Sequence, residues 1–280
     1  MKQYFKGWYF KCQSDSQSIA VIPAIHEIGG KRFCSIQVIT EEGAWYGRIE
    51  ELNKQCFGEK GLKLKINKSN LKISGNLRFS HLTPLSYDIM GPFSFVLFME
   101  CRHSVYSMLH RVNGCICVND KEYSFENAYG YWEGDRGRSF PKEYAWTHSF
   151  IEGKDGAIVG SLMLSVADIP LAGLHFTGII GIVLWKGREY RFAMYLGARV
   201  VKKENGVLLI RQGNMELEAR LLEQKPHPLQ APVNVAMART IHENITCKAF
   251  YRFRYKGVTV FACETDKASF EYEYEWRKLC

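Results

Sequence analysis

Two acidic residues stand two positions apart in the aromatic stretch YGYWEGDRGRSFPKEYAWTH, residues 129–148. Side chains two positions apart in a strand point to the same side, so Glu133 and Asp135 are expected to share a face with Tyr131. Two carboxyl groups at short range repel when both are ionised, which raises one pKa and leaves one group protonated. A protonated carboxyl in an apolar setting is a general acid. Glu133 and Asp135 are therefore candidate catalytic acids, and Tyr131 is a candidate ligand-binding residue.

Other residues of the same stretch could assist this chemistry. His148 is a candidate general base because imidazole titrates near neutral pH, although a hydrogen-bonded interior histidine is the alternative. Trp132 and Trp146 could line a ligand cavity or fill a core. Arg138 is a further ligand-binding candidate. If Arg136 or Arg138 reached the acids, it would lower their pKa, and the stretch would then be an ion-paired structural turn.

A second group of polar residues follows the apolar residues 93–99. Glu100 lies either at a strand end in water or in a buried position with a shifted pKa, and the second case makes it a ligand-site candidate. Cys101 and His103 share a face of an extended strand, and His110 could return from a neighbouring turn. Their spacing matches no standard zinc site, so we predict no metal. The chain also lacks phosphate-binding loops and the serine nucleophile elbow, so we expect neither nucleotide-dependent chemistry nor serine hydrolysis.

The segments that must position these residues alternate between apolar and polar residues, with a period of two. Residues 62–66 alternate apolar and basic, and the segment from Phe270 to Trp276 alternates aromatic and acidic residues. Both patterns indicate strands. Four pairs favour tight turns: Asn113–Gly114, Asn119–Asp120, Lys186–Gly187 and Asn205–Gly206. Convincing helical patterns are scarce, so we predict an all-β chain of antiparallel sandwiches or barrels.

The length of 280 residues favours two units over one. We place the domains at residues 1–150 and 151–280, with a junction in the polar stretch EGKDG at residues 152–156. The apolar fraction of 46% indicates a folded protein with a sizeable core. The net charge is +8, from 37 basic and 29 acidic residues, but no Lys/Arg run is longer than two. We therefore expect a solvated basic surface and no nucleic-acid partner.

The sequence also predicts a compartment. The opening MKQYFKGWYFKC has no long apolar core and no cleavage site, so we expect no signal peptide. The longest apolar run, near residues 179–185, is too short to span a bilayer. Nine cysteines at irregular spacing, without a CxxC pair, favour reduced thiols in a cytoplasm. We expect no stable membrane insertion and leave peripheral contact open.

Three segments, in order along the chain, resemble the tocopherol cyclase family. Residues 6–11, KGWYFK, are similar to the GWYFK opening of that family. Residues 84–93, PLSYDIMGPF, lead into a second similar segment at 98–101. The stretch 129–148 is close to the family pattern GYxEKDWGxxFPxxYxW, and residues 231–241 match more weakly. Within that pattern Gly134 replaces a lysine and Arg136 replaces a tryptophan.

The resemblance implies two lipocalin-like antiparallel β-barrels packed together, with a hydrophobic ligand in a barrel mouth. Related carotenoid hydratases and bacterial two-barrel cyclases share that fold. Tocopherol cyclase adds a phenolic hydroxyl across a prenyl double bond, and this chemistry implies no cofactor. The family's opening segment faces the ligand, so Trp8 and Tyr9 are ligand-binding candidates, although a strand that closes a barrel would explain them equally well.

Three hypotheses remain open at the level of sequence. The chain is a cofactor-independent cyclase or hydratase acting on a prenylated or isoprenoid-like molecule, a non-catalytic carrier of such a ligand, or an interaction protein without a pocket. The surroundings of Glu133 and Asp135 separate them, because acids that open into an apolar cavity favour an enzyme and acids paired with arginines favour a carrier. The expected partner is a hydrophobic small molecule, and the oligomeric state is not predicted.

Overall fold

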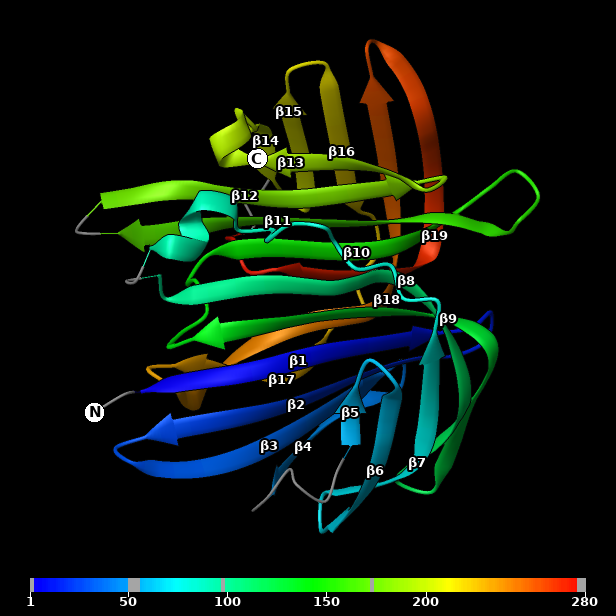
Figure 1. Cartoon of the computed structure of the whole chain (residues 1–280), viewed down its shortest axis with the longest axis vertical. Helices are drawn as coiled ribbons and strands as arrows, with labels where there is room; N and C mark the ends of the chain where they lie inside the picture. Colours follow the sequence, from blue (N-terminus) through cyan, green and yellow to red (C-terminus); the bar gives the residue numbers. More distant parts are fainter. Residues whose placement is uncertain (1–2, 50–55, 97–98, 172–173, 276–280) are drawn as a thin grey trace. The chain divides into compact units, whose positions relative to one another are not determined.

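The computed structural model describes residues 3–49, 56–96, 99–171 and 174–275 (Figure 1). In these ranges the chain is almost entirely antiparallel β-strand, with two short 3₁₀-helices, η1 (Gly91–Phe95) and η2 (Met194–Leu196). The prediction of an all-β fold is therefore confirmed. The chain divides into two compact units. Unit 1 comprises residues 1–91, 99–140 and 227–240, and unit 2 comprises residues 92–98, 141–226 and 241–280.

The first sheet belongs to unit 1 and has the strand order β4-β3-β2-β1-β9-β8-β7-β6-β5. Its central strands β1, β9 and β8 are antiparallel neighbours, and they carry most of the residues singled out in the first half of the sequence. The bounds are β1 (Tyr4–Gln13), β2 (Ser18–Ile28), β3 (Lys31–Thr40), β4 (Gly43–Ile49), β5 (Cys56–Gly58), β6 (Gly61–Lys68), β7 (Leu71–Ser80), β8 (Cys101–Val118) and β9 (Lys121–Gly137).

The second sheet has the order β13-β12-β11-β10-β19-β18-β16-β15-β14, and β17 also pairs with β18. The bounds are β10 (Tyr144–Glu152), β11 (Ile158–Leu171), β12 (Leu174–Trp185), β13 (Arg188–Ala193), β14 (Arg199–Glu204), β15 (Val207–Gln212), β16 (Met215–Leu221), β17 (His227–Val233), β18 (Ala236–Tyr255) and β19 (Val258–Tyr272).

The two sheets repeat one strand order. In each, the first strand along the chain lies between the second strand and the last one: β1 between β2 and β9, and β10 between β11 and β19. From there toward the edges, neighbouring strands follow the chain order in both sheets, except that β18 lies next to β16 in the second sheet. The chain therefore carries the same topology twice, although its sequence shows no clear internal repeat.

Period-two alternation builds the core of unit 1. In β6, Leu62, Leu64 and Ile66 are buried in the hydrophobic cluster of this unit, whereas Lys63 and Lys65 are exposed. Full burial of one such aliphatic side chain contributes roughly 1.5–3 kcal/mol. The strand predicted for residues 62–66 is therefore confirmed, and its apolar face is the one that faces the core.

Three of the four predicted turns join hairpins. Asn205 and Gly206 have φ values of 46° and 75° and connect β14 to β15. Asn119–Asp120 and Lys186–Gly187 also have positive φ at both positions. Asn113–Gly114 was wrongly predicted as a turn, because β8 passes through it as a strand irregularity between Val112 and Gly114.

Two further segments differ from the expected strands. Residues 91–95 form η1, so the apolar run at 93–99 does not begin as a strand. Strand β19 ends at Tyr272, and Tyr274 is buried in the core of unit 2, while Trp276 lies outside the described residues.

The domain boundary predicted after residue 150 falls within β10, and the division into two domains at that point stays a prediction. In the described ranges, no helix has the length and apolar character to cross a membrane.

Candidate functional site

Strand β9 presents different chemistry on its two faces. Trp132 belongs to the hydrophobic core cluster of unit 1. Tyr131 and Glu133 flank Trp132 in the strand and therefore point to the opposite face, where both are buried. The strand continues through Gly134 to Gly137. Glu133 and Asp135 thus share one face with Tyr131, as the spacing predicts.

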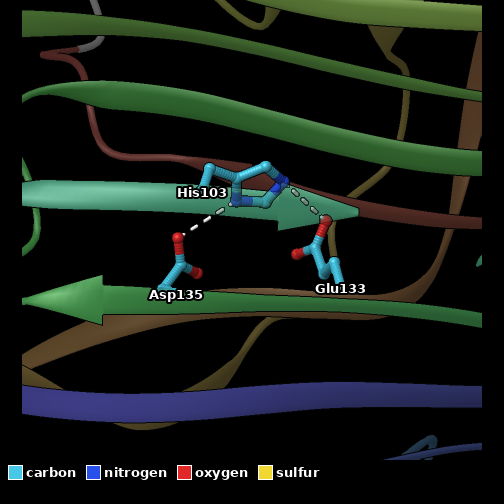
Figure 2. A group of neighbouring side chains, drawn as sticks. All are labelled: His103, Glu133 and Asp135. Atoms are coloured by element: carbon cyan, nitrogen blue, oxygen red, sulfur yellow. Dashed lines mark hydrogen bonds and ion pairs between the residues drawn. The ribbon is translucent and has the colours of Figure 1, made fainter. Parts of the chain in front are cut away.

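His103 lies between the two acids (Figure 2). It is directly opposite Asp135 in the pairing of β8 with β9. Its Nδ1 is 3.0 Å from Oδ1 of Asp135, and its Nε2 is 3.1 Å from Oε2 of Glu133. The side chains of His103, Glu133 and Asp135 are 12%, 7% and 23% exposed. We call these three residues the His103 cluster, and Asp135 is its most accessible member.

The charges of the His103 cluster determine the protonation of the imidazole. Burial alone lowers the pKa of His103, because it disfavours the cation. The attraction of Glu133 and Asp135, together with their hydrogen bonds, outweighs burial and raises the pKa of His103 well above its usual value. Both neighbours are carboxylates that accept hydrogen bonds, so both ring nitrogens carry a proton. The cluster is an imidazolium held between two acids.

Two neutral groups also form hydrogen bonds with the acids of the cluster. The hydroxyl of Tyr131 donates to Oε2 of Glu133. Burial, and then the charge of Glu133, raise the pKa of Tyr131 well above its ordinary range, so the phenol remains protonated. The thiol of Cys101 donates to Oδ1 of Asp135 at 3.5 Å, and burial together with the Asp135 charge likewise raises the pKa of Cys101. Asp135 therefore has a hydrogen bond with His103 and accepts from a neutral thiol, whereas Glu133 forms an ion pair with His103 and accepts from a neutral phenol.

The cluster is suited to proton transfer. An imidazolium and two carboxylates can exchange a proton over hydrogen-bond distances, and such exchange is the basis of general acid–base catalysis. The same residues carry donor atoms that bind metal ions, all within 4.8 Å of one another. In this structure the two ring nitrogens face different carboxylates and the ring lies between them. The absence of a metal site stays a prediction.

The remaining candidates in unit 1 lie at several positions around this site. Tyr9 is the partner of Glu133 across β1 and β9 and is buried. Trp8 packs against the core cluster, with its ring 4.9 Å from that of Phe57. Glu100 precedes β8, and its carbonyl accepts from the backbone N–H of Arg138 at 2.7 Å. The side chain of Arg138 is exposed, as is that of Arg136.

Two sequence candidates belong to unit 2. His148 is buried in β10, and its Nε2 is 3.1 Å from Oγ of Ser161. Trp146 is buried on the same face of β10, with its ring 6.5 Å from the His148 imidazole. Glu133 and Asp135 lie in unit 1. The assignment of His148 as a catalytic base stays a prediction.

His103 is the member of the cluster that sequence reasoning did not connect with the two acids. It was considered with Cys101 and His110 as a metal ligand, whereas the structure pairs it with Glu133 and Asp135. The available signal was the hairpin at Asn119–Asp120, which makes the segments on either side of it antiparallel neighbours. The arginines beside the acids are exposed, so the cation that contacts both acids is a histidine.

The two antiparallel sheets define an all-β, double-barrel lipocalin-like fold, which solved structures share. No family model and no curated protein matches the chain. An AttH candidate from Nitrosomonas europaea has a TM-score of 0.51 at 12% identity, covering 97% of this chain and 93% of its own. CghA with Sch210972 has a TM-score of 0.57 at 9% identity, covering 96% and 88%. Kievitone hydratase from Nectria haematococca has a TM-score of 0.51 at 8% identity, covering 96% and 88%.

Proposed function

We propose that the His103 cluster is the acid–base centre of a cofactor-free enzyme that cyclises or hydrates a hydrophobic, prenylated or isoprenoid-like small molecule. The observation that carries the proposal is a titratable imidazole held between two carboxylates in a largely buried position. The sequence resemblance to tocopherol cyclases and the fold shared with kievitone hydratase support this class of reaction.

The cation in the cluster distinguishes an acid–base centre from a purely structural ion pair. A guanidinium stays charged at all accessible pH values, whereas an imidazolium can release its proton. The substrate meets Asp135, because its carboxyl is the most exposed of the three. His103 supplies a proton to Asp135 through the Nδ1 contact, while Glu133 and the Tyr131 hydroxyl hold the ring in place.

The proposed reaction conserves protons. Asp135 protonates one carbon of the alkene, and the π electrons of the double bond form the new C–H bond. The oxygen of a substrate hydroxyl, or of water, then forms a C–O bond with the resulting cation. The proton of that oxygen returns to the carboxylate of Asp135 and passes from there to Nδ1 of His103, so the cluster ends as the imidazolium and two carboxylates with which it began. Aromatic faces stabilise a passing cation, and Tyr9 and Tyr131 lie on the same sheet face as the cluster.

A non-catalytic carrier is the second candidate. The ion pairs that raise the pKa of His103 favour an imidazole that stays charged near neutral pH, and a group that keeps its charge is suited to binding a ligand without proton transfer. We also propose a cytoplasmic location, because none of the seven cysteines whose side chains are described forms a disulfide.

Incubation with a geranylated hydroquinone, followed by chromatography and mass spectrometry, tests the enzyme. A cyclised product keeps the mass of the probe, and a hydrated product gains one water. Asp135→Asn and Glu133→Gln are expected to abolish turnover while binding of the probe is retained. Glu122→Gln, an exposed position in the same strand, is the matched control. Binding without turnover by the parent protein identifies a carrier, and equal turnover by both acid variants refutes the assignment.

A further inference from the structure

The three most exposed large hydrophobic side chains among the described residues all belong to unit 2. Phe95 is 85% exposed, Val258 is 68% exposed and Leu196 is 49% exposed. Single exposed apolar residues are common on protein surfaces, whereas grouped ones mark interaction sites. The positions of these three residues in unit 2 decide which case applies.

Two short 3₁₀-helices carry two of these side chains and contact each other. Phe95 lies in η1 and Leu196 lies in η2. The ring of Phe93 in η1 is 6.1 Å from that of Tyr195 in η2 and 5.8 Å from that of Phe176 in β12. Phe93 therefore packs η1 against η2, and the two exposed side chains project from neighbouring segments.

A row of charged side chains begins directly after η2. Arg199 is the first residue of β14 and the direct partner of Arg211 in β15. Arg211 is opposite Glu216 in β16, and Glu216 is opposite Arg254 in β18. Leu217, the neighbour of Glu216 in sequence, lies in the core cluster of unit 2. The row therefore points away from the core, on the outer face of the sheet.

The exposed apolar side chains lie at the two ends of this row. Leu196 precedes Arg199 by three residues at the first end. At the other end, Arg254 is opposite Thr259 across β18 and β19, and Val258 is the neighbour of Thr259. We use the name arginine patch for Phe95, Leu196, Arg199, Arg211, Arg254 and Val258.

The row presents positive charge to solvent. Glu216 is its one acid, with Oε2 2.6 Å from Nε of Arg211 and Oε1 3.7 Å from Nη1 of Arg254. The side chain of Glu216 is 14% exposed, whereas those of Arg211 and Arg254 are 50% and 42% exposed. The acid therefore lies beneath the two guanidinium groups, which it holds in place.

Arg199 adds a cation that the fold does not neutralise. It is exposed and forms no ion pair with any described residue. Its direct partner across the strands is Arg211, and like charges placed opposite each other destabilise a strand pair. An anion that contacts both guanidinium groups removes this repulsion.

The combination of side chains matches an anionic bilayer surface. Guanidinium groups bind phosphate oxygens through paired hydrogen bonds. Exposed aromatic and aliphatic side chains enter the boundary between headgroups and acyl chains, which needs no shaped partner surface. A protein partner instead needs a contiguous apolar centre with a polar rim, whereas here the apolar side chains stand at the ends of a charged row.

We propose that the arginine patch docks unit 2 on a bilayer that contains anionic phospholipid. Its guanidinium groups contact the lipid phosphates, and its apolar side chains enter the headgroup boundary. This docking does not rest on the proposed reaction. Because isoprenoid-like molecules partition into bilayers, it also brings the chain to the phase that holds the proposed class of substrate.

Co-sedimentation with lipid vesicles tests the docking. One set of vesicles is phosphatidylcholine alone, and the other contains about 30 mol% phosphatidylserine. We expect the chain to bind the anionic vesicles about tenfold or more tightly than the neutral ones. The affinity should fall severalfold between about 0.1 M and about 0.5 M salt, because salt screens the contact between arginines and headgroups.

Variants separate the charged and apolar parts of the arginine patch. The double variant Arg199→Gln/Arg254→Gln is expected to lose the preference for anionic vesicles by about tenfold. Phe95→Ser is expected to bind both kinds of vesicle severalfold more weakly. The matched control is Lys63→Gln/Arg78→Gln, which removes two exposed positive charges from unit 1 and should bind as the parent does.

Arg199→Gln alone distinguishes a binding role from a structural one. Loss of this guanidinium removes the repulsion with Arg211, so the melting temperature should stay the same or rise. Binding to anionic vesicles should nevertheless weaken severalfold. A lower melting temperature together with unchanged vesicle binding would show that Arg199 serves the fold, and would overturn its role in docking.

The remaining outcomes identify other occupants of the patch. Absence of binding to anionic vesicles, or an equal loss in the Lys63→Gln/Arg78→Gln control, would overturn the proposal. Displacement from vesicles by inorganic phosphate at constant ionic strength would assign the row to a soluble anion. Self-association in sedimentation velocity that Phe95→Ser abolishes, without vesicle binding, would assign the patch to a second copy of the chain. Failure of the hydroquinone reaction leaves the vesicle result unchanged.

Discussion

Nδ1 of His103 stands 3.0 Å from Oδ1 of Asp135, and the two residues are direct partners across β8 and β9. Their contact is therefore set by backbone pairing in the middle of a sheet. Such placement limits movement of both side chains, which is what a centre for directed proton transfer requires.

The first prediction concerns the stability contributed by His103. His103→Gln leaves the buried Glu133 and the partly buried Asp135 without the cation between them, and loss of one partner from a buried ion pair costs about 3 kcal/mol or more. Urea denaturation measures the loss. His175→Gln is the control, because His175 also pairs with an acid, Asp168, but is 64% exposed. That pair contributes less than about 1 kcal/mol. Similar losses in both variants would contradict the prediction.

The second prediction is a fall in stability with rising pH. The pKa of His103 is raised in the folded state, so the folded chain holds a proton that the unfolded chain loses above about pH 6.5. The stabilisation is complete below that pH and is lost as pH rises toward the folded pKa. Denaturation at several values between about pH 6.5 and 8, below thiol ionisation in the unfolded chain, should show a steeper decline for the parent than for His103→Gln. Parallel profiles would rule out the charged imidazole.

The third prediction separates Tyr131 from a structurally similar tyrosine. Tyr131→Phe removes the donor to Glu133, and Tyr144→Phe removes the donor to Glu271 in unit 2. Both variants should lose a similar amount of stability, about 1.5–3 kcal/mol, because each removes a buried hydrogen bond to a charged group. Turnover of the hydroquinone should fall roughly tenfold or more in Tyr131→Phe alone. An equal fall in both variants would show that the effect on activity is structural.

The fourth prediction tests the space at Gly130. Gly130→Ala places a methyl group 2.2 Å from Nε2 of His110, so we expect a loss of about 1–3 kcal/mol from overpacking. Gly7→Ala is the control, because the nearest atom to a Cβ there lies 3.7 Å away. Thermal denaturation compares the two variants. An undisturbed Gly130→Ala protein would show that the imidazole moves aside without cost.

Much of the fold could be predicted from alternation and turn chemistry. Apolar residues at every second position predicted the strand around Leu64, and an Asn-Gly pair predicted the hairpin at Asn205 because both residues adopt positive φ. The pair Asn113–Gly114 misled, since a glycine inside a long strand serves a bulge as readily as a turn. The repeated strand order was beyond sequence reasoning, because pairing between distant strands leaves no local pattern.

The candidate site was predicted in part. The two-residue spacing of Glu133 and Asp135 placed them on one face, and that relation holds in β9. Their partner was missed for a specific reason. An unbroken ladder counted back from the hairpin at Asn119–Asp120 would pair His103 with Arg136, but register shifts in β8 move His103 opposite Asp135. The positions of such bulges depend on packing, so the register that they produce cannot be deduced from residue types alone.

The alternation along β9 also constrains how this chain can change. Between residues 130 and 135, point substitutions at odd positions alter the face that carries the acids, and those at even positions alter the face that carries Trp132, so the two surfaces can diverge independently. A one-residue deletion between Gly130 and Asp135 would instead turn the tryptophan toward the acids and an acid toward the hydrophobic core. Homologues should therefore vary in residue identity along this strand while its length stays fixed.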